Sequence, residues 1–105
     1  METMKVNDLR LAFQREGQGE PFLFIHGFPL DHDFWQPLSS HLKDYFDLIM
    51  PDLPGFGTSD IPGGEHTIDE MAADLAGLLD KMNIRQTYLA GHSMGGYVSL
   101  AFARA

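Results

Sequence analysis

The sequence predicts an α/β fold in which a mostly parallel sheet of about five strands is flanked by three helices. From Pro21 onward, short apolar runs alternate three times with helical patterns, through short connections. Before that point, Leu9, Leu11 and Phe13 alternate with more polar residues, which is the period-two pattern of a strand with one buried face. We therefore expect one domain over residues 1–105, led by an antiparallel hairpin.

The predicted strands follow the chain in order. Asn7-Asp8 can turn a short first strand into the second, and the glycines at 17 and 19 then break the chain. The third strand is apolar on both faces, as expected for an interior strand of a parallel sheet covered by helices on both sides. The five predicted strands are 4–6, 9–13, 22–25, 46–50 and 87–90.

The first predicted helix begins after the third strand. Asp33 is placed to cap it, provided that Pro37 lies in its first turn. One face would then be apolar, and its members are Phe34 or Trp35, Leu38, Leu42 and Tyr45.

Two further helices follow the long loop over 51–64. Thr67 and Glu70 have the spacing of a capping box, and Asn83 is a plausible stop. The apolar positions between them keep helical spacing, with Asp69, Glu70, Asp74 and Lys81 on the other side. The last predicted helix covers 94–105.

Composition excludes several classes of function. Seven Lys and Arg against 15 Asp and Glu give a formal net charge of −8, which disfavours binding to nucleic acid or an anionic membrane. The chain has no Cys, so a disulfide, a thiolate metal site and a Cys nucleophile are excluded. No apolar run approaches the roughly 20 residues of a membrane helix. The first residues lack a secretory signal, which makes the cytoplasm the expected location.

The residues Gly91-His92-Ser93-Met94-Gly95 fit the pattern G-x-S-x-G between a predicted strand and a predicted helix. A nucleophile on such a sharp turn has close neighbours, so glycines two residues before and after it avoid collisions. The turn also leaves Ser93 at a helix N-terminus, where free N–H groups favour a developing oxyanion.

Two other motifs precede this turn. His26-Gly27-Phe28-Pro29 follows the third strand, and the run Asp52-Leu53-Pro54-Gly55-Phe56-Gly57-Thr58-Ser59 follows the fourth. With these three motifs in order, the chain resembles the α/β-hydrolase family over essentially its whole length. It is most similar to small esterases, enol-lactonases and cofactor-free haloperoxidases.

The resemblance implies roles for individual residues. Ser93 would be the nucleophile, and the backbone N–H groups of Phe28 and Met94 would form the oxyanion hole. Gly91 and Gly95 would be the glycines of the nucleophile turn. His26 and Gly27 would belong to the motif loop, with His26 structural rather than catalytic. Asp52 would shape its loop and would not be the triad acid.

The serine itself narrows the chemistry. Epoxide hydrolases and haloalkane dehalogenases resemble this pattern but place Asp where Ser93 stands. Ser93 instead suits attack on a carboxylic ester, thioester or lactone through an acyl-enzyme. A cofactor-free haloperoxidase or a C–C bond hydrolase is the alternative, since both resemble esterases in these motifs. We expect no cofactor, and no metal site because no His-Glu-x-x-His spacing occurs.

The acid and the base of the family's triad are missing from this sequence. In the family they follow the nucleophile, yet the twelve residues after Ser93 contain no His, Asp or Glu. His32, His41 and His66 are expected to be exposed polar residues, and His92 should point away from Ser93. The chain is therefore interpreted as the N-terminal part of a hydrolase, weak or inactive alone.

The same interpretation predicts an exposed edge. The family's sheet has the order 1-2-4-3-5-6-7-8, so the strand 87–90 would lie at the edge, beside apolar Tyr97, Leu100 and Phe102. We expect a homo-oligomer or association with a complementary C-terminal fragment. A non-catalytic fragment that self-associates is the alternative to an enzyme.

Overall fold

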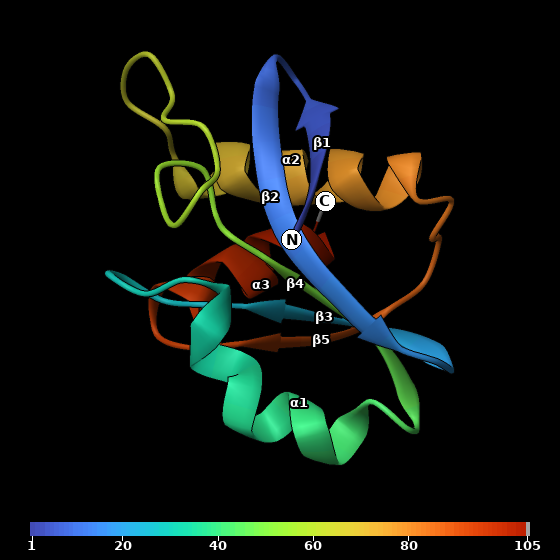
Figure 1. The fold of residues 1–105 in the computed structure, drawn as a ribbon. Helices are drawn as coiled ribbons and strands as arrows, with labels where there is room; N and C mark the ends of the chain where they lie inside the picture. Colours follow the sequence, from blue (N-terminus) through green and yellow to red (C-terminus); the bar gives the residue numbers. More distant parts are fainter. Residues whose placement is uncertain (105) are drawn as a thin grey trace.

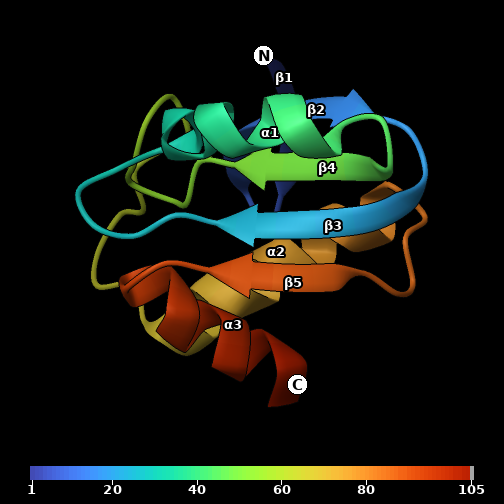
Figure 2. The same ribbon diagram turned by 90° about the horizontal axis from the view of Figure 1, so that it is seen from below.

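The computed structural model describes residues 1–104 and contains a five-stranded sheet. Its strands are β1 (Glu2–Val6), β2 (Leu9–Gly17), β3 (Glu20–Ile25), β4 (Phe46–Pro51) and β5 (Tyr88–Gly91). Their order in the sheet is β1-β2-β4-β3-β5 (Figure 2). Only β2 runs against the other four, since it pairs antiparallel with β1 and β4 while β3 pairs parallel with β4 and β5. The predicted fold class, hairpin and strand order are confirmed.

The second strand is longer than its local pattern indicates. β2 continues to Gly17, because its second half pairs with β4 in a register that sets Gln14 opposite Met50 and Glu16 opposite Leu48. The predicted break at the two glycines thus follows the strand instead of shortening it. This extension depends on a partner strand that is distant in sequence.

The third strand lies in the interior of the sheet, as predicted. Leu23 and Ile25 enter a core cluster with Leu75 and Val98 on one face. Phe24 enters a second cluster with Trp35 on the other face. An uninterrupted apolar run is therefore required, because both faces of β3 are covered.

The first helical segment differs from its prediction. A 3-10 helix, η1 (His32–Trp35), leads into α1 (Gln36–Leu42), and the capping side chain is that of Asp31, which accepts from the Asp33 N–H. A 3-10 turn has three residues per turn, so it shifts which side chains face the core. Trp35 is buried, whereas Leu38 is half-exposed and Tyr45 lies beyond the helix and is exposed. Pro37 lies in the first turn of α1, as predicted.

The other face of the sheet is covered by α2 (Ile68–Lys81) and α3 (Met94–Arg104) (Figure 1). The capping box of Thr67 and Glu70 is present, and Asn83 follows the helix with a φ of 60°. Asp74 was predicted on the polar face of α2, and this is wrong. It is buried, where it accepts from the Asn7 side chain at 3.1 Å.

The loops that follow β3, β4 and β5 gather at one edge of the sheet, where the carboxyl ends of these parallel strands meet (Figures 1 and 2). Ligand sites of α/β sheets form at this edge. The last residue of the predicted third helix, Ala105, lies outside the described residues. Over residues 1–104, the structure contains no helix of the length and apolarity that a membrane crossing needs.

Candidate functional site

Ser93 lies on a tight turn between β5 and α3 and is exposed to solvent. Its φ of 56° is in the left-handed region, which costs a residue with a side chain roughly 1–2 kcal/mol. The turn is closed by the Gly95 N–H, which donates to the His92 carbonyl at 2.9 Å. A strained backbone that presents a hydroxyl at the carboxyl edge of a sheet is the geometry of a nucleophile turn.

The two glycines of the turn are both required by close approach. A Cβ on Gly95 would overlap the carbonyl oxygens of Ile25 and His26 at the end of β3. A Cβ on Gly91 would overlap the Gly95 carbonyl and the Ser99 hydroxyl. Gly95 therefore permits the close approach of α3 to the end of β3, and Gly91 permits that of α3 to the end of β5.

Gly27 brings the loop after β3 against the serine. A Cβ on this residue would lie 2.6 Å from the His92 carbonyl oxygen and 3.0 Å from the Ser93 Cβ. The structure thus places the His26-Gly27-Phe28 loop directly beside Ser93. The backbone of the next residue, Phe28, is consequently close to the serine.

The N–H groups of Phe28 and Met94 have no hydrogen-bond acceptor among residues 1–104. The Met94 N–H is one of the first donors of α3, which have no partner inside a helix. The Phe28 N–H lies in a turn that the Leu30 N–H closes on the Gly27 carbonyl at 2.8 Å. Both donors are therefore free to bind an oxygen atom from a ligand.

Aromatic rings surround this loop. The Phe28 side chain is 68% exposed and contacts Phe56 edge to face, with 5.8 Å between the ring centroids. Phe56 also packs against the His26 ring at 5.4 Å. The exposed Phe28 ring therefore belongs to the loop that lies against Ser93.

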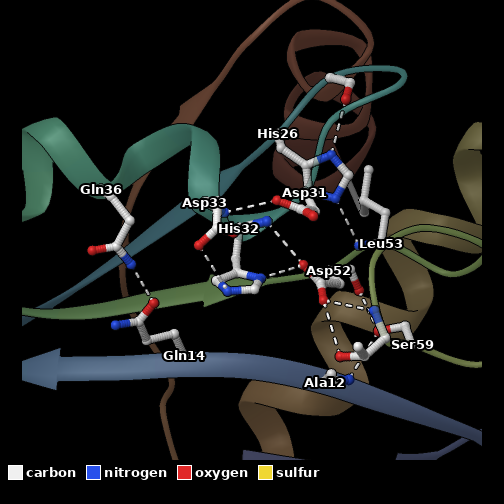
Figure 3. Close-up of polar contacts among 12 residues, drawn as sticks. Ala12, Gln14, His26, Asp31, His32, Asp33, Gln36, Asp52, Leu53 and Ser59 are labelled. Atoms are coloured by element: carbon white, nitrogen blue, oxygen red, sulfur yellow. Dashed lines mark hydrogen bonds and ion pairs between the residues drawn. The ribbon is translucent and has the colours of Figure 1, made fainter. Parts of the chain in front are cut away.

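His26 is fully buried and joins two loops (Figure 3). Its Nδ1 lies 3.0 Å from the Gly27 carbonyl oxygen, and its Nε2 accepts from the Leu53 N–H at 2.9 Å. Burial lowers the pKa of His26 below its usual range, although the Gly27 carbonyl and nearby carboxylates oppose this change. A neutral ring whose two nitrogens are both engaged holds the loops together and has no free nitrogen to act as a base.

Asp52 is also buried and organises the loop after β4 (Figure 3). Its Oδ1 accepts from both the backbone N–H and the Nδ1 of His32 at 2.8 Å, and its Oδ2 accepts from the Thr58 N–H at 3.0 Å. Burial alone would raise its pKa, but these donors outweigh burial and lower the pKa of Asp52. The carboxylate is thus ionised, and it accepts from His32 in the loop after β3 and from Thr58 in the loop after β4.

The other histidines depart in part from their prediction as exposed polar residues. His41 is exposed, but His32 bonds to Asp52 and His66 Nε2 lies 2.6 Å from the Asp74 carboxylate. The His92 ring packs against Phe34, with 4.4 Å between centroids. No side chain of residues 1–104 hydrogen-bonds to the Ser93 hydroxyl.

The side chains of Asp31, His32 and Asp52 lie close enough to consider a metal ion, with candidate ligand atoms within 4.8 Å of one another. However, both oxygens of Asp52 already accept from N–H or O–H groups. Donors in those positions would have to leave before a cation could bind. The arrangement therefore fits a hydrogen-bond network.

Sequence reasoning missed two members of this network. His32 carries no motif signal, since its role depends on a carboxylate 20 residues later. Ser59 is the last residue of the second motif, and its hydroxyl donates to the Asp52 carbonyl at 2.7 Å and accepts from the Ala12 N–H at 2.8 Å. The motif indicated a shaped loop, but not that it is bonded to β2.

A serine on the turn between a strand and a helix of a mixed α/β sheet is the arrangement of the hydrolase class of α/β folds. A family model described as alpha/beta hydrolase fold matches residues 20–105. The chain belongs to this family.

Individual relatives differ in the reactions their names state. The cis-3-alkyl-4-alkyloxetan-2-one decarboxylase of Shewanella oneidensis is 37% identical over 101 residues, which are 92% of this chain and 32% of that protein. Epoxide hydrolase 2 of Siraitia grosvenorii is 34% identical over 103 residues, 95% of this chain and 33% of that protein. A protein named as a non-heme chloroperoxidase is also among the relatives.

Among solved structures, a thermophilic esterase from Thermogutta terrifontis superposes with a TM-score of 0.91 at 42% identity. The match covers 98% of this chain and 40% of the esterase. The chain spans about a third of the length of the curated relatives named above.

The glycines of α3 provide a matched pair of variants. We expect Gly95→Ala to lower the free energy of unfolding by more than about 2 kcal/mol, because the new methyl group would press on two backbone carbonyls. Gly96→Ala, on the same helix turn with open space around it, should change stability by about 1 kcal/mol or less. Urea denaturation followed by circular dichroism measures both. Equal stabilities for the two variants would contradict the close approach of α3 to β3.

The buried His26 predicts a pH dependence of stability. Folding lowers the pKa of His26, so the unfolded chain binds more protons than the folded chain as pH falls. The contribution of the neutral His26 to the free energy of unfolding is therefore fully present above the unfolded pKa near 6.5, and it is lost as pH falls below that value. Below it, the wild type should lose up to about 1.4 kcal/mol per pH unit more than His26→Gln, which cannot titrate there. Urea denaturation between pH 7.5 and pH 5 gives this difference. His41→Gln, at an exposed position, should keep the wild-type slope of unfolding free energy against pH. If His26→Gln also keeps that slope, His26 is not the group responsible for the pH dependence.

Proposed function

We propose that this chain carries the nucleophile and the oxyanion hole of a serine hydrolase that acts on carboxylic esters or lactones. The observation that supports this most directly is the juxtaposition of Gly27 and Ser93, which brings the free Phe28 N–H beside a strained, exposed serine. The esterase likeness supports an ester substrate, and the relative named for an oxetan-2-one, a cyclic ester, supports a lactone.

In the proposed reaction, the Ser93 Oγ attacks the carbonyl carbon while a base accepts its proton. The negative charge that develops on the carbonyl oxygen would be stabilised by the N–H groups of Phe28 and Met94. Each donor would lower the activation free energy by roughly 3 kcal/mol. The alcohol oxygen leaves with a proton, and water then releases the carboxylic acid from the acyl-enzyme. Because residues 1–104 supply no bonded base to Ser93, the proposal assigns the histidine and the acid to residues outside this range.

The exposed ring of Phe28, which contacts the partly buried Phe56, favours a neutral, apolar acyl group. The net charge of −8 also favours a neutral substrate, since it repels an anionic one. A haloperoxidase or C–C bond hydrolase remains the alternative within the family, supported by the relative named as a chloroperoxidase.

A chimera tests the proposed nucleophile. This chain replaces the segment that it matches in the Thermogutta terrifontis esterase, so that the remainder of that esterase completes the domain. We expect the chimera to hydrolyse p-nitrophenyl acetate and Ser93→Ala to lower kcat by about 10⁴-fold or more, since the attacking oxygen is lost. Mass spectrometry of the wild-type chimera, quenched during turnover, should find one acetyl group on the peptide that contains Ser93.

Ser99→Ala is the matched control, because Ser99 lies on the same helix with its hydroxyl bonded to the Gly95 carbonyl at 2.7 Å. It should keep kcat within about tenfold, since it removes a neutral hydrogen bond of about 1 kcal/mol. A chimera whose circular dichroism and melting are normal but whose hydrolysis is unaffected by Ser93→Ala would contradict the proposal.

A second candidate function, self-association, is favoured by the edge position of β5 and by exposed Tyr97 and Leu100. Phe102 is only partly exposed and packs against the core, so the predicted apolar patch is smaller than expected. An edge strand beside exposed apolar side chains invites pairing with another chain. A stable monomer at micromolar concentration by light scattering would exclude this candidate.

A further inference from the structure

The turn that carries Phe28 is fixed at both of its ends by two adjacent residues of another loop. On one side, His26 accepts from the Leu53 N–H at 2.9 Å. On the other side, His32 donates twice to the Asp52 carboxylate at 2.8 Å. Figure 3 shows His26 and His32 flanking the loop, with Asp52 and Leu53 facing them.

The Asp52 end is itself rigid. The residue directly follows β4, and its N–H donates to the Ala12 carbonyl of β2 at 2.9 Å. Its Oδ2 is held by the Thr58 N–H, and its carbonyl accepts from the Ser59 hydroxyl. A carboxylate with this many fixed contacts cannot move to follow His32, so His32 must follow it.

We propose that His32 is a positioning residue which, through Asp52, holds the Phe28 N–H in place to bind the oxyanion. This inference rests on the proposed function, because it concerns the same oxyanion hole. His32 follows Phe28 by only four positions, and the Gly27–Leu30 hydrogen bond makes the first part of this segment a tight turn. Displacement of His32 is therefore transmitted to the Phe28 N–H. Displacement of about 1 Å in such a site can cost about 100-fold in rate.

The geometry distinguishes two substitutions at this position. Asparagine presents an N–H donor on its Cγ atom, as histidine does at Nδ1, so His32→Asn can keep the side-chain bond to Asp52. Leucine fills a similar volume without a donor, so His32→Leu loses this bond and retains the backbone bond alone. His41→Leu makes the same chemical change at an exposed position and serves as the control.

The first arm of the test uses the 105-residue chain and needs no activity. Hydrogen–deuterium exchange should be about tenfold faster over residues 27–33 in His32→Leu, because loss of one of the two bonds to Asp52 makes local opening easier. In His32→Asn, exchange over these residues should stay within about threefold of wild type. Exchange within α2 should be unchanged in both variants and in His41→Leu. Unchanged exchange over 27–33 in His32→Leu would overturn the proposal.

The second arm uses the chimera with p-nitrophenyl acetate. His32→Leu should lower kcat by about 10- to 100-fold with KM within about threefold, since an oxyanion donor acts mainly in the transition state. His32→Asn should restore kcat to within about threefold of wild type. Equal kcat in His32→Leu and wild type, or a change in KM alone, would overturn the proposal.

The two proposals fail in different ways. If Ser93→Ala leaves the chimera active, the proposed nucleophile is wrong whatever His32 does. If Ser93→Ala abolishes activity but His32→Leu and His32→Asn are equally impaired, the nucleophile stands and the positioning role is wrong.

Discussion

The geometry of the site depends on how closely the first turn of α3 approaches the end of β3. Gly95 lies against the carbonyl oxygens of Ile25 and His26, and the His92 N–H donates to the Ile25 carbonyl at 3.0 Å. Because backbone packs directly on backbone, no side-chain rearrangement can change this distance. Ser93 lies within this contact and opposite Gly27, so the serine and the loop after β3 form one rigid unit. The left-handed φ of Ser93 is tolerated because the surrounding backbone determines it.

A second, polar constraint fixes the ends of the central strands to one another. The apolar clusters hold the helices on the faces of the sheet, but at the carboxyl edge the buried groups are His26, Asp52 and Ser59. Buried polar groups are costly unless they are hydrogen-bonded, and an ionised carboxylate needs several donors. Asp52 obtains them from His32 in the loop after β3 and from Thr58 in its own loop. The bonds of Ser59 to Ala12 and of Leu53 to His26 extend this network to β2 and to the end of β3. Hydrogen bonds have a defined geometry, whereas apolar packing is not directional, so this network fixes the positions of the loops more closely than packing alone would.

The elements that the sequence predicted well are those whose signal lies within a short segment of the chain. The capping box at Thr67 and Glu70 joins residues three apart, and the third strand is marked by one uninterrupted apolar run. The contacts that require this run come from distant helices, but the run itself is visible locally. The features that the sequence did not predict depend on partners far along the chain. β2 is prolonged by β4, and His32 is recruited by Asp52, in each case through a partner far along the chain. The helical pattern assigns Asp74 to the polar face of α2, whereas its side chain is buried against Asn7. Asn7 lies 67 residues away, so the local pattern of α2 contains no sign of this contact.

Backbone groups supply most of the proposed site, and only the nucleophile is a side chain. The Phe28 and Met94 N–H groups and the Ser93 turn depend on the close approach of β3, β5 and α3, which is made by backbone atoms and not by the Ser93 hydroxyl. One framework can therefore serve different reactions, which agrees with relatives named as an epoxide hydrolase and a decarboxylase beside a solved esterase. A carboxylate at this position suits an alkyl-enzyme ester, whereas a hydroxyl suits an acyl-enzyme. In the proposed function, the hydroxyl at position 93 is therefore the feature that favours attack on an ester or lactone over epoxide opening.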